Sequence, residues 1–218
     1  ISNLAPEGQV PASVTYSFYI GAAVLVLCVI YSFIFIREMP PREYAEYHGI
    51  TKEQEESKEG MLTLLRKAPR TFWTVGLVQF FCWSAFLYMW TYTNGAIADT
   101  VWGTTDTRSA AYQEAGNWVG VLFAVQAVGS VIWAVAIPMF KSHKTAYSLS
   151  LLLGAAGFIS TMFITNQYAL FISYMLIGCA WAAMLALPFT ILTSSLSGKN
   201  MGTYLGLFNG TICVPQIC

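Results

Sequence analysis

The chain has 218 residues, of which 56% are hydrophobic and 10% are charged, and its formal net charge is zero. Soluble domains usually carry about 25% charged residues, so this composition excludes an ordinary soluble domain and predicts an all-α, polytopic membrane protein. The neutral charge balance also gives no reason to expect a nucleic-acid partner.

Six apolar segments follow one another along the chain, and a helix needs about 20 such residues to cross a bilayer. They are Val14–Ile36, Phe72–Asp99, 118–140, 145–165, 168–196 and a last one from Met201 onward. Segments 39–70 and 100–117 between them are polar and are predicted to be loops. Within the first of these, Met61–Lys67 has the pattern of a short amphipathic helix at the membrane surface.

The cations are distributed unevenly between the two ends of these spans. When the spans are threaded back and forth, every Lys and Arg except Arg108 falls on the same side. The positive-inside rule then predicts that segment 39–70 is cytoplasmic and that segment 100–117 faces outward. Because the chain begins at Ile1 without a methionine and stops at Cys218 within an apolar run, we expect an internal piece of a longer protein.

The segment Phe72–Asp99 concentrates polar and aromatic side chains inside an apolar span. Gln79, Trp83, Phe86, Trp90 and Asn94 recur at steps of three or four residues, so they share one face of a helix. Amide groups in hydrocarbon must be shielded by other helices or by a water-filled cavity. This face therefore predicts a helix that lines a cavity for a neutral, hydroxyl-rich solute.

Further polar side chains occur in other spans, namely Gln126 in the third and Asn209 and Gln216 in the sixth. Taken singly, each amide is better explained by a hydrogen bond between helices than by ligand binding. Indole rings stack on the apolar faces of sugar rings, however, and amides pair with hydroxyl groups. The combination of amides with tryptophans inside spans, including Trp133 and Trp181, favours a carbohydrate over an ion or an amino acid.

Proline and glycine residues interrupt the last two spans. Pro188 and Pro215 each remove a backbone hydrogen bond and are expected to bend their helices, which is how many transporters shape a gate. Gly202, Gly206 and Gly210 recur every four residues and predict the close approach of a neighbouring helix.

Metal and enzymatic chemistry find little support in the sequence. No span has an ionisable residue in its middle, and both histidines, His48 and His143, lie outside the spans. A haem site needs axial ligands at membrane depth and a zinc protease needs an H-E-x-x-H helix. We therefore expect no cofactor, no metal and no enzymatic activity.

Three stretches resemble a known family. LGLFNGTICVPQI, residues Leu205–Ile217, resembles the penultimate helix of sucrose-type sugar:cation symporters, which reads L-G-x-x-N-x-x-I-x-x-P-Q. AMLALPFTIL, Ala183–Leu192, is similar to the preceding helix, and TYTNGAIADTVWG, residues 91–103, to the seventh helix and its exit. The resemblance covers most of residues 14–218 and points to the sucrose and glycoside branch of the major facilitator superfamily.

The resemblance implies that the chain covers about helices six to eleven of twelve. Residues 1–36 would be the last helix of the amino-terminal bundle with its outer lead, 37–70 the central cytoplasmic loop, and 71–218 a truncated carboxy-terminal bundle. The chain departs from the family at the end of the seventh helix, where plant sucrose carriers have an acidic pair and an arginine. Here Thr93 and Asn94 are followed by Asp99, which is the candidate for a coupling residue.

The implied function is secondary active transport of a sugar, a di- or oligosaccharide such as sucrose or maltose, across the cytoplasmic (inner or plasma) membrane. The implied mechanism is alternating access, with a proton as the co-transported ion and the amino-terminal bundle as the missing partner. A membrane sensor that binds the sugar without moving it is the alternative. The predicted substrate contacts are Gln79, Trp83, Trp90, Asn94, Gln126, Asn209 and Gln216, and the predicted gating positions are Pro188 and Pro215.

Overall fold

A computed structural model describes residues 12–36, 40, 43, 47, 60–196 and 200–217 of the chain. The chain divides into two compact units, Ile1–Glu55 and Glu56–Cys218. Every regular element of the described residues is a helix, which confirms the predicted all-α class.

The first unit contains one long helix, α1, which runs from Ala12 to Phe35. Its apolar part, Val14–Phe35, has 22 residues, and its most apolar stretch is not covered by any other described part of the chain. Such a helix is long enough to cross the hydrocarbon core of a bilayer, and its uncovered apolar side chains are stable only in lipid or against other protein.

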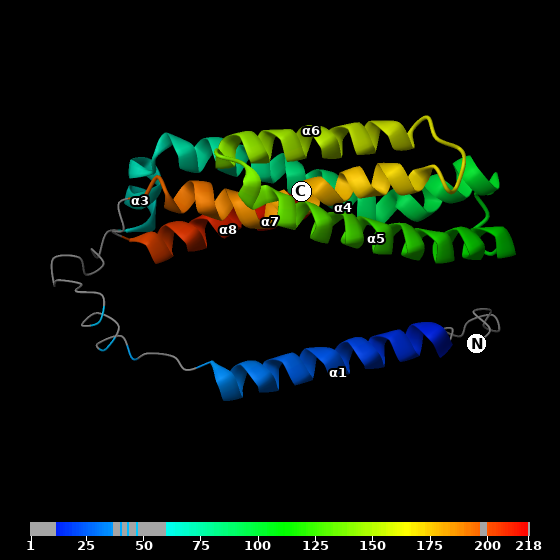
Figure 1. Cartoon of the computed structure of the whole chain (residues 1–218), viewed down its shortest axis with the longest axis horizontal. Helices are drawn as coiled ribbons and strands as arrows, with labels where there is room; N and C mark the ends of the chain where they lie inside the picture. The colour runs from blue at the N-terminus through cyan, green and yellow to red at the C-terminus, as the bar shows by residue number, and fades with distance from the viewer. Residues whose placement is uncertain are drawn as a thin grey trace. The chain divides into compact units, whose positions relative to one another are not determined.

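The second unit is a bundle of long helices that run side by side (Figure 1). Its elements are α3 (Met61–Lys67), α4 (Arg70–Trp102), α5 (Ala110–Ala136), the short 3₁₀ turn η2 (Ile137–Met139), α6 (His143–Thr161), α7 (Leu170–Thr193) and α8 (Met201–Ile217). The short helix α3 has the bounds that its amphipathic pattern predicts.

Four helical segments of the described chain are long and apolar enough to cross a membrane: Val14–Phe35, Arg70–Trp102, Ala110–Met139 and Leu170–Thr193. The remaining predicted spans also form helices, α6 with 19 residues and α8 with 17. The protein is therefore a multi-pass membrane protein.

Two helices are longer than their apolar runs predict. α4 continues to Trp102, and Gly103 then adopts φ 64°, the left-handed conformation that ends many helices. The backbone N–H of Gly103 donates to the Asp99 carbonyl oxygen, and that of Thr104 donates to the Ala98 carbonyl oxygen. α5 begins at Ala110 because the Ser109 side chain accepts a hydrogen bond from the Tyr112 backbone N–H. The prediction that residues 100–117 form a loop was therefore wrong for most of its length, since a polar sequence can be helical beyond the membrane.

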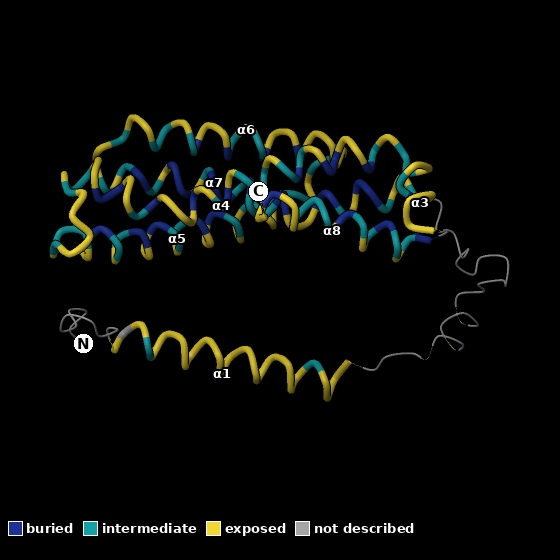
Figure 2. The backbone as a smooth tube through the Cα atoms, turned by 180° about the vertical axis from the view of Figure 1, so that it is seen from behind, coloured by how far each residue is buried: buried dark blue, intermediate teal, exposed yellow. Residues whose placement is uncertain are grey.

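Helix α7 lies at the centre of the bundle and packs against α4, α5 and α6. Burial in Figure 2 follows this arrangement, with buried stretches on the inward faces of the helices. The helices approach each other closely at glycines. A Cβ atom on Gly129 of α5 would lie 2.8 Å from the Met175 carbonyl oxygen. A Cβ atom on Gly178 of α7 would collide with the Gln126 carbonyl oxygen. A Cβ atom on Gly206 or Gly210 of α8, by contrast, would meet nothing within 4 Å, so the predicted close approach along α8 is not found among the described residues.

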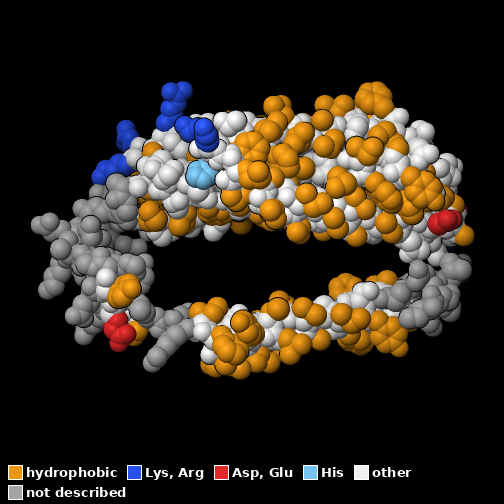
Figure 3. Space-filling model, viewed as in Figure 1, with side chains coloured by type: hydrophobic (Ala, Val, Ile, Leu, Met, Phe, Trp, Pro, Cys, Tyr) orange, Lys and Arg blue, Asp and Glu red, His pale blue; other side chains and the backbone are white. Residues whose placement is uncertain are grey.

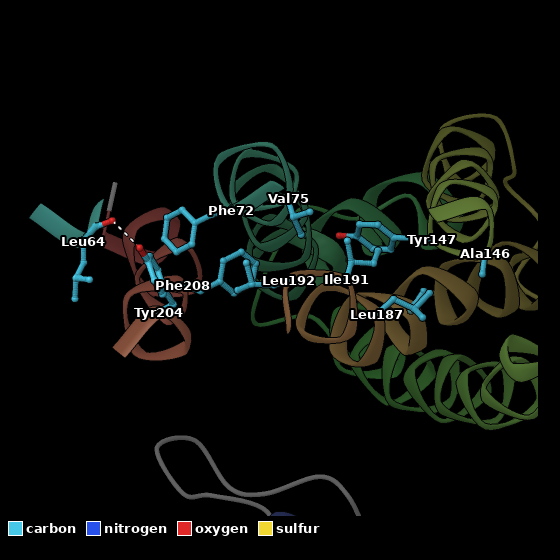
Figure 4. Close-up of a cluster of buried hydrophobic side chains, with 11 residues drawn as sticks. Leu64, Phe72, Val75, Ala146, Tyr147, Leu187, Ile191, Leu192, Tyr204 and Phe208 are labelled. Atoms are coloured by element: carbon cyan, nitrogen blue, oxygen red, sulfur yellow. Dashed lines mark hydrogen bonds between the residues drawn. The ribbon is translucent and has the colours of Figure 1, made fainter. Parts of the chain in front are cut away.

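Charges separate toward the two ends of the bundle (Figure 3). Arg66, Lys67 and Arg70 lie around the start of α4, and Lys141 and Lys144 around the start of α6. Near this end an apolar cluster includes Leu64, Phe72, Tyr204 and Phe208, and the Tyr204 hydroxyl donates to the Leu64 carbonyl oxygen at 3.1 Å (Figure 4). This contact fixes α3 against α8.

Candidate functional site

A cluster of aromatic side chains joins α4 to α7, and its members range from the buried Phe86 to Trp90, which is 43% exposed. It consists of Trp83, Phe86 and Trp90 of α4 and Trp181 of α7, and we refer to it as the tryptophan cluster. The ring of Trp181 lies 5.8 Å from that of Trp83 and 5.3 Å from that of Trp90, in edge-to-face geometry. These are the distances and angles that aromatic pairs prefer.

The position of Trp181 could not be assigned from the sequence, which places it inside the fifth span but does not say which helix it faces. The 3.6-residue period identifies which residues of one helix share a face, but it carries no information about the partner. In the structure Trp181 contacts three aromatic rings of α4, the third being Phe86 at 5.0 Å. It belongs to the same cluster as the predicted contacts Trp83 and Trp90.

Gln79 is 1% exposed and lies one turn before Trp83 on α4. Its side-chain nitrogen donates to the Met184 carbonyl oxygen of α7 at 3.2 Å, so half of the amide forms the interhelical hydrogen bond that is the ordinary role of such a residue. Its side-chain oxygen is buried and has no hydrogen-bond partner within the described chain, and the same holds for the indole nitrogen of Trp83. An unpaired acceptor and an unpaired donor thus occur one turn apart.

Gln126 of α5 is also buried, 6% exposed, and its side-chain oxygen has no partner in the described residues. Its backbone carbonyl lies against Gly178 of α7. Gly178, Trp181 and Met184 are successive at three-residue steps, so they span about 9 Å along the α7 axis. The structure therefore places Gln79, Gln126 and the tryptophan cluster along the same short length of α7.

Asn94 occupies a different level of the bundle. It lies 15 residues after Gln79 on α4, which corresponds to about 22 Å along the helix. Its side chain packs against α5, where its oxygen would be 3.4 Å from a Cβ atom on Gly116, and this oxygen has no hydrogen-bond partner in the described chain. One small sugar could not contact both Asn94 and Gln79.

The two amides of α8 differ from those of α4 and α5, since Asn209 and Gln216 are both exposed. The side-chain nitrogen of Gln216 donates to the Ile212 carbonyl oxygen of its own helix at 3.0 Å. Within the described chain neither residue is brought to the tryptophan cluster. Pro215, on the buried side of α8, and Pro188, buried in α7, each lie inside a continuous helix.

Asp99 lies in the last turn of α4, at the end of that helix remote from Arg70. It is exposed and forms no ion pair with any other residue that the structure describes. A carboxylate near the carboxyl end of a helix gains no stabilisation from the helix dipole. Asp99 therefore has the position of a charged residue at the membrane boundary.

Trp133 of α5 shows how an intramembrane tryptophan looks when its role is structural. Its indole nitrogen donates to the Ser150 hydroxyl of α6 at 2.8 Å, and Ser150 in turn donates to the Ala146 carbonyl oxygen at 2.7 Å. All three groups are satisfied within the protein. Trp83 has no such partner, which makes it available to a ligand.

The comparisons with known proteins agree with the architecture. The sequence model of the Major Facilitator Superfamily matches residues 10–217. Searches of curated proteins and of solved structures gave no match.

Proposed function

Because the chain belongs to the major facilitator superfamily, whose members are membrane transporters, we propose that it forms part of a secondary transporter for a sugar in the cytoplasmic membrane. The bilayer and a transported solute are then its partners. The superfamily consists of transporters rather than enzymes, so the chemistry of the site is recognition. The sucrose and glycoside branch, and a di- or oligosaccharide as the substrate, are part of the proposal.

One observation carries the choice of a sugar. Gln79 presents a buried, unpaired acceptor and Trp83 a buried, unpaired donor, one turn apart on α4. A cation would satisfy only the oxygen and an anion only the indole N–H, whereas a hydroxyl group both donates and accepts. A ligand with several hydroxyl groups therefore suits this site better than an ion.

The tryptophan cluster supplies the second requirement of sugar binding, which is an apolar surface. Trp83, Trp90 and Trp181 form a continuous aromatic group. Gln79 and Gln126 contact α7 at Met184 and Gly178, which flank Trp181 by three residues on either side. We assign these five residues to the sugar contacts. Asn94, Asn209 and Gln216 remain candidates for contacts made at other levels or during other steps of transport.

Transport would proceed by alternating access, with a second helical bundle of the same protein facing this one. In that division residues 1–36 belong to the amino-terminal bundle, 37–70 to the central loop and 71–218 to the carboxy-terminal bundle. Pro188 and Pro215 would shape the gating helices. We assign proton binding to a carboxylate of the amino-terminal bundle. Within the present chain, Asp99 is the candidate for a coupling residue.

The test is sugar uptake by the full-length protein in proteoliposomes, with sucrose and maltose as probes. We expect Trp83→Ala and Gln126→Ala each to lower uptake about tenfold or more, the effect of losing one buried contact. Trp73→Ala is the matched control, since Trp73 is also on α4 but is 56% exposed. Unchanged uptake in both site variants would refute the site.

The same proteoliposomes test whether uptake is coupled to protons and whether the protein is a transporter or a sensor. Uptake that stops when the proton gradient is dissipated supports proton symport, and uptake that continues contradicts it. Saturable sugar binding without any flux would favour the membrane sensor over the transporter.

A further inference from the structure

We infer that Gln79 of α4 is a positioning residue that links the solute site to the point where Pro188 interrupts the backbone hydrogen bonding of α7. The two ends of its amide have different roles. The side-chain nitrogen replaces a backbone donor that the proline removes, and the side-chain oxygen is presented to the solute. The first role is independent of what the protein transports, whereas the second rests on the proposed function.

Pro188 leaves one carbonyl group of α7 without its donor. Proline has no backbone N–H, and Pro188 lies inside the helix. Each backbone N–H of an α-helix bonds the carbonyl oxygen four residues earlier, so the carbonyl group concerned is that of Met184. Met184 is 0% exposed and Pro188 is fully buried, so this carbonyl group needs a partner from within the protein.

Gln79 supplies the missing donor. Its side-chain nitrogen donates to the Met184 carbonyl oxygen at 3.2 Å, and Gln79 is itself only 1% exposed. Prolines are tolerated inside membrane helices where a neighbouring helix provides a partner for the backbone group that they free. The bond from Gln79 therefore completes the hydrogen bonding of α7 as well as joining α7 to α4.

Ser130 of α5 makes a bond to α7 of the ordinary kind. Its hydroxyl donates to the Gly178 carbonyl oxygen at 2.9 Å, and also to the Gln126 carbonyl oxygen of its own helix. Four residues after Gly178 is Ala182, which lies in the same helix and has a backbone N–H, so the Gly178 carbonyl group keeps its own donor. The Ser130 bond is an addition, whereas the Gln79 bond is a replacement.

The other end of the Gln79 amide belongs to the proposed solute site. Its oxygen is buried without a partner in the described chain, one turn from the unpaired indole nitrogen of Trp83. Hydrogen bonds that share one group polarise each other, so a solute hydroxyl that donates to this oxygen strengthens the bond from the nitrogen to Met184. Occupation of the site thereby tightens the contact between α4 and α7 beside Pro188.

The role of the nitrogen is tested by a double-mutant cycle on the full-length protein in detergent. Gln79→Met keeps the length of the side chain and removes both its donor and its acceptor. Pro188→Ala returns a backbone N–H to α7, which then bonds the Met184 carbonyl oxygen without help from α4. We expect Gln79→Met to lower the melting temperature by about 2–4 °C, and by less than about half as much when Pro188→Ala is present.

Ser130→Ala is the matched control, because it removes a bond to a carbonyl group of α7 that keeps its backbone donor. It should lower the melting temperature equally with and without Pro188→Ala. If Pro188→Ala does not fold, Pro188→Gly takes its place in the cycle, since glycine also restores the N–H. The inference is overturned if the effect of Gln79→Met, like that of Ser130→Ala, is the same in both backgrounds.

Uptake of sucrose and maltose in proteoliposomes tests the role of the oxygen. Gln79→Met should raise KM about tenfold, and Pro188→Ala should not restore it, because the oxygen is still missing. A KM that is unchanged in Gln79→Met, or restored in the double variant, overturns this role. Absence of uptake by the parent protein would refute the proposed function and the role of the oxygen together, whereas the role of the nitrogen is decided by the melting temperatures alone.

Discussion

The seam between α5, α6 and α7 and the inner face of α4 are both polar by sequence, yet they are built on opposite principles. In the seam the serine hydroxyl groups find partners: Ser130 donates to the Gln126 and Gly178 carbonyl oxygens, and Ser160 and Ser173 are 2.7 Å apart. The side-chain oxygen of Gln126, which we assign to the sugar site, is the exception. On α4 the Gln79 oxygen and the Trp83 nitrogen are buried without one.

The difference teaches how structural and functional polar residues can be told apart inside a membrane. A satisfied group contributes to helix association, by about 0.6 kcal/mol on average. An unsatisfied buried group lowers the stability of the ligand-free protein by about 1–3 kcal/mol. Such a loss is tolerated where a bound ligand supplies the missing hydrogen bond. Substitutions in the seam should therefore affect stability, and those on α4 should affect transport.

The largest effect is expected at one of the closest contacts of the seam, Gly178. Gly178→Val places a branched side chain against the Gln126 carbonyl oxygen and should lower the free energy of unfolding by about 1–3 kcal/mol or more. Gly120→Ala is the control, because a Cβ atom on Gly120 of α5 would meet nothing within 4 Å in the described part of the chain, and it should leave stability unchanged or slightly raised. Melting temperature in detergent measures both. Equal melting temperatures for the two variants would mean that α5 and α7 do not pack at Gly178.

A pair of tryptophan variants separates the two regions directly. Trp133→Phe removes a donor that is bonded to Ser150 and should lower stability by about 1 kcal/mol while sparing sugar uptake. Trp83→Phe removes a donor without a partner, so it should lower uptake without the loss of melting temperature expected for Trp133→Phe. The reverse pattern would exchange the roles assigned to the two residues.

The smallest effect is expected on α8. Gln216→Ala removes an exposed amide whose nitrogen is bonded within its own helix, so stability should change by less than about 0.5 kcal/mol. Sugar uptake should fall less than in Gln126→Ala, measured side by side in proteoliposomes. A larger fall in Gln216→Ala would show that α8 contacts the sugar more closely than α5 does.

The sequence by itself determined the class of this protein and the position of its helices. Apolar runs of about 20 residues are stable in a bilayer only as helices, so the runs predict spans without reference to any tertiary contact. Helix ends were less accurate, since α5 begins eight residues before its apolar run, where Ser109 caps it. The period of α4 also predicted correctly that Gln79, Trp83, Phe86 and Trp90 share a face, whereas Asn94, the fifth residue predicted on it, packs against α5.

Tertiary structure alone decided which of these residues have partners. Gln79 and Gln216 are the same residue type in similar apolar surroundings, but Gln79 bonds Met184 on another helix, 105 residues away, whereas Gln216 bonds its own helix. The glycines behave likewise: Gly206 and Gly210 of the regular series on α8 face open space in the described chain, whereas close contacts occur at Gly129, Gly154, Gly157 and Gly178. A helical period specifies a face, but only the packing of whole helices specifies what that face meets, because each contact joins residues remote in sequence.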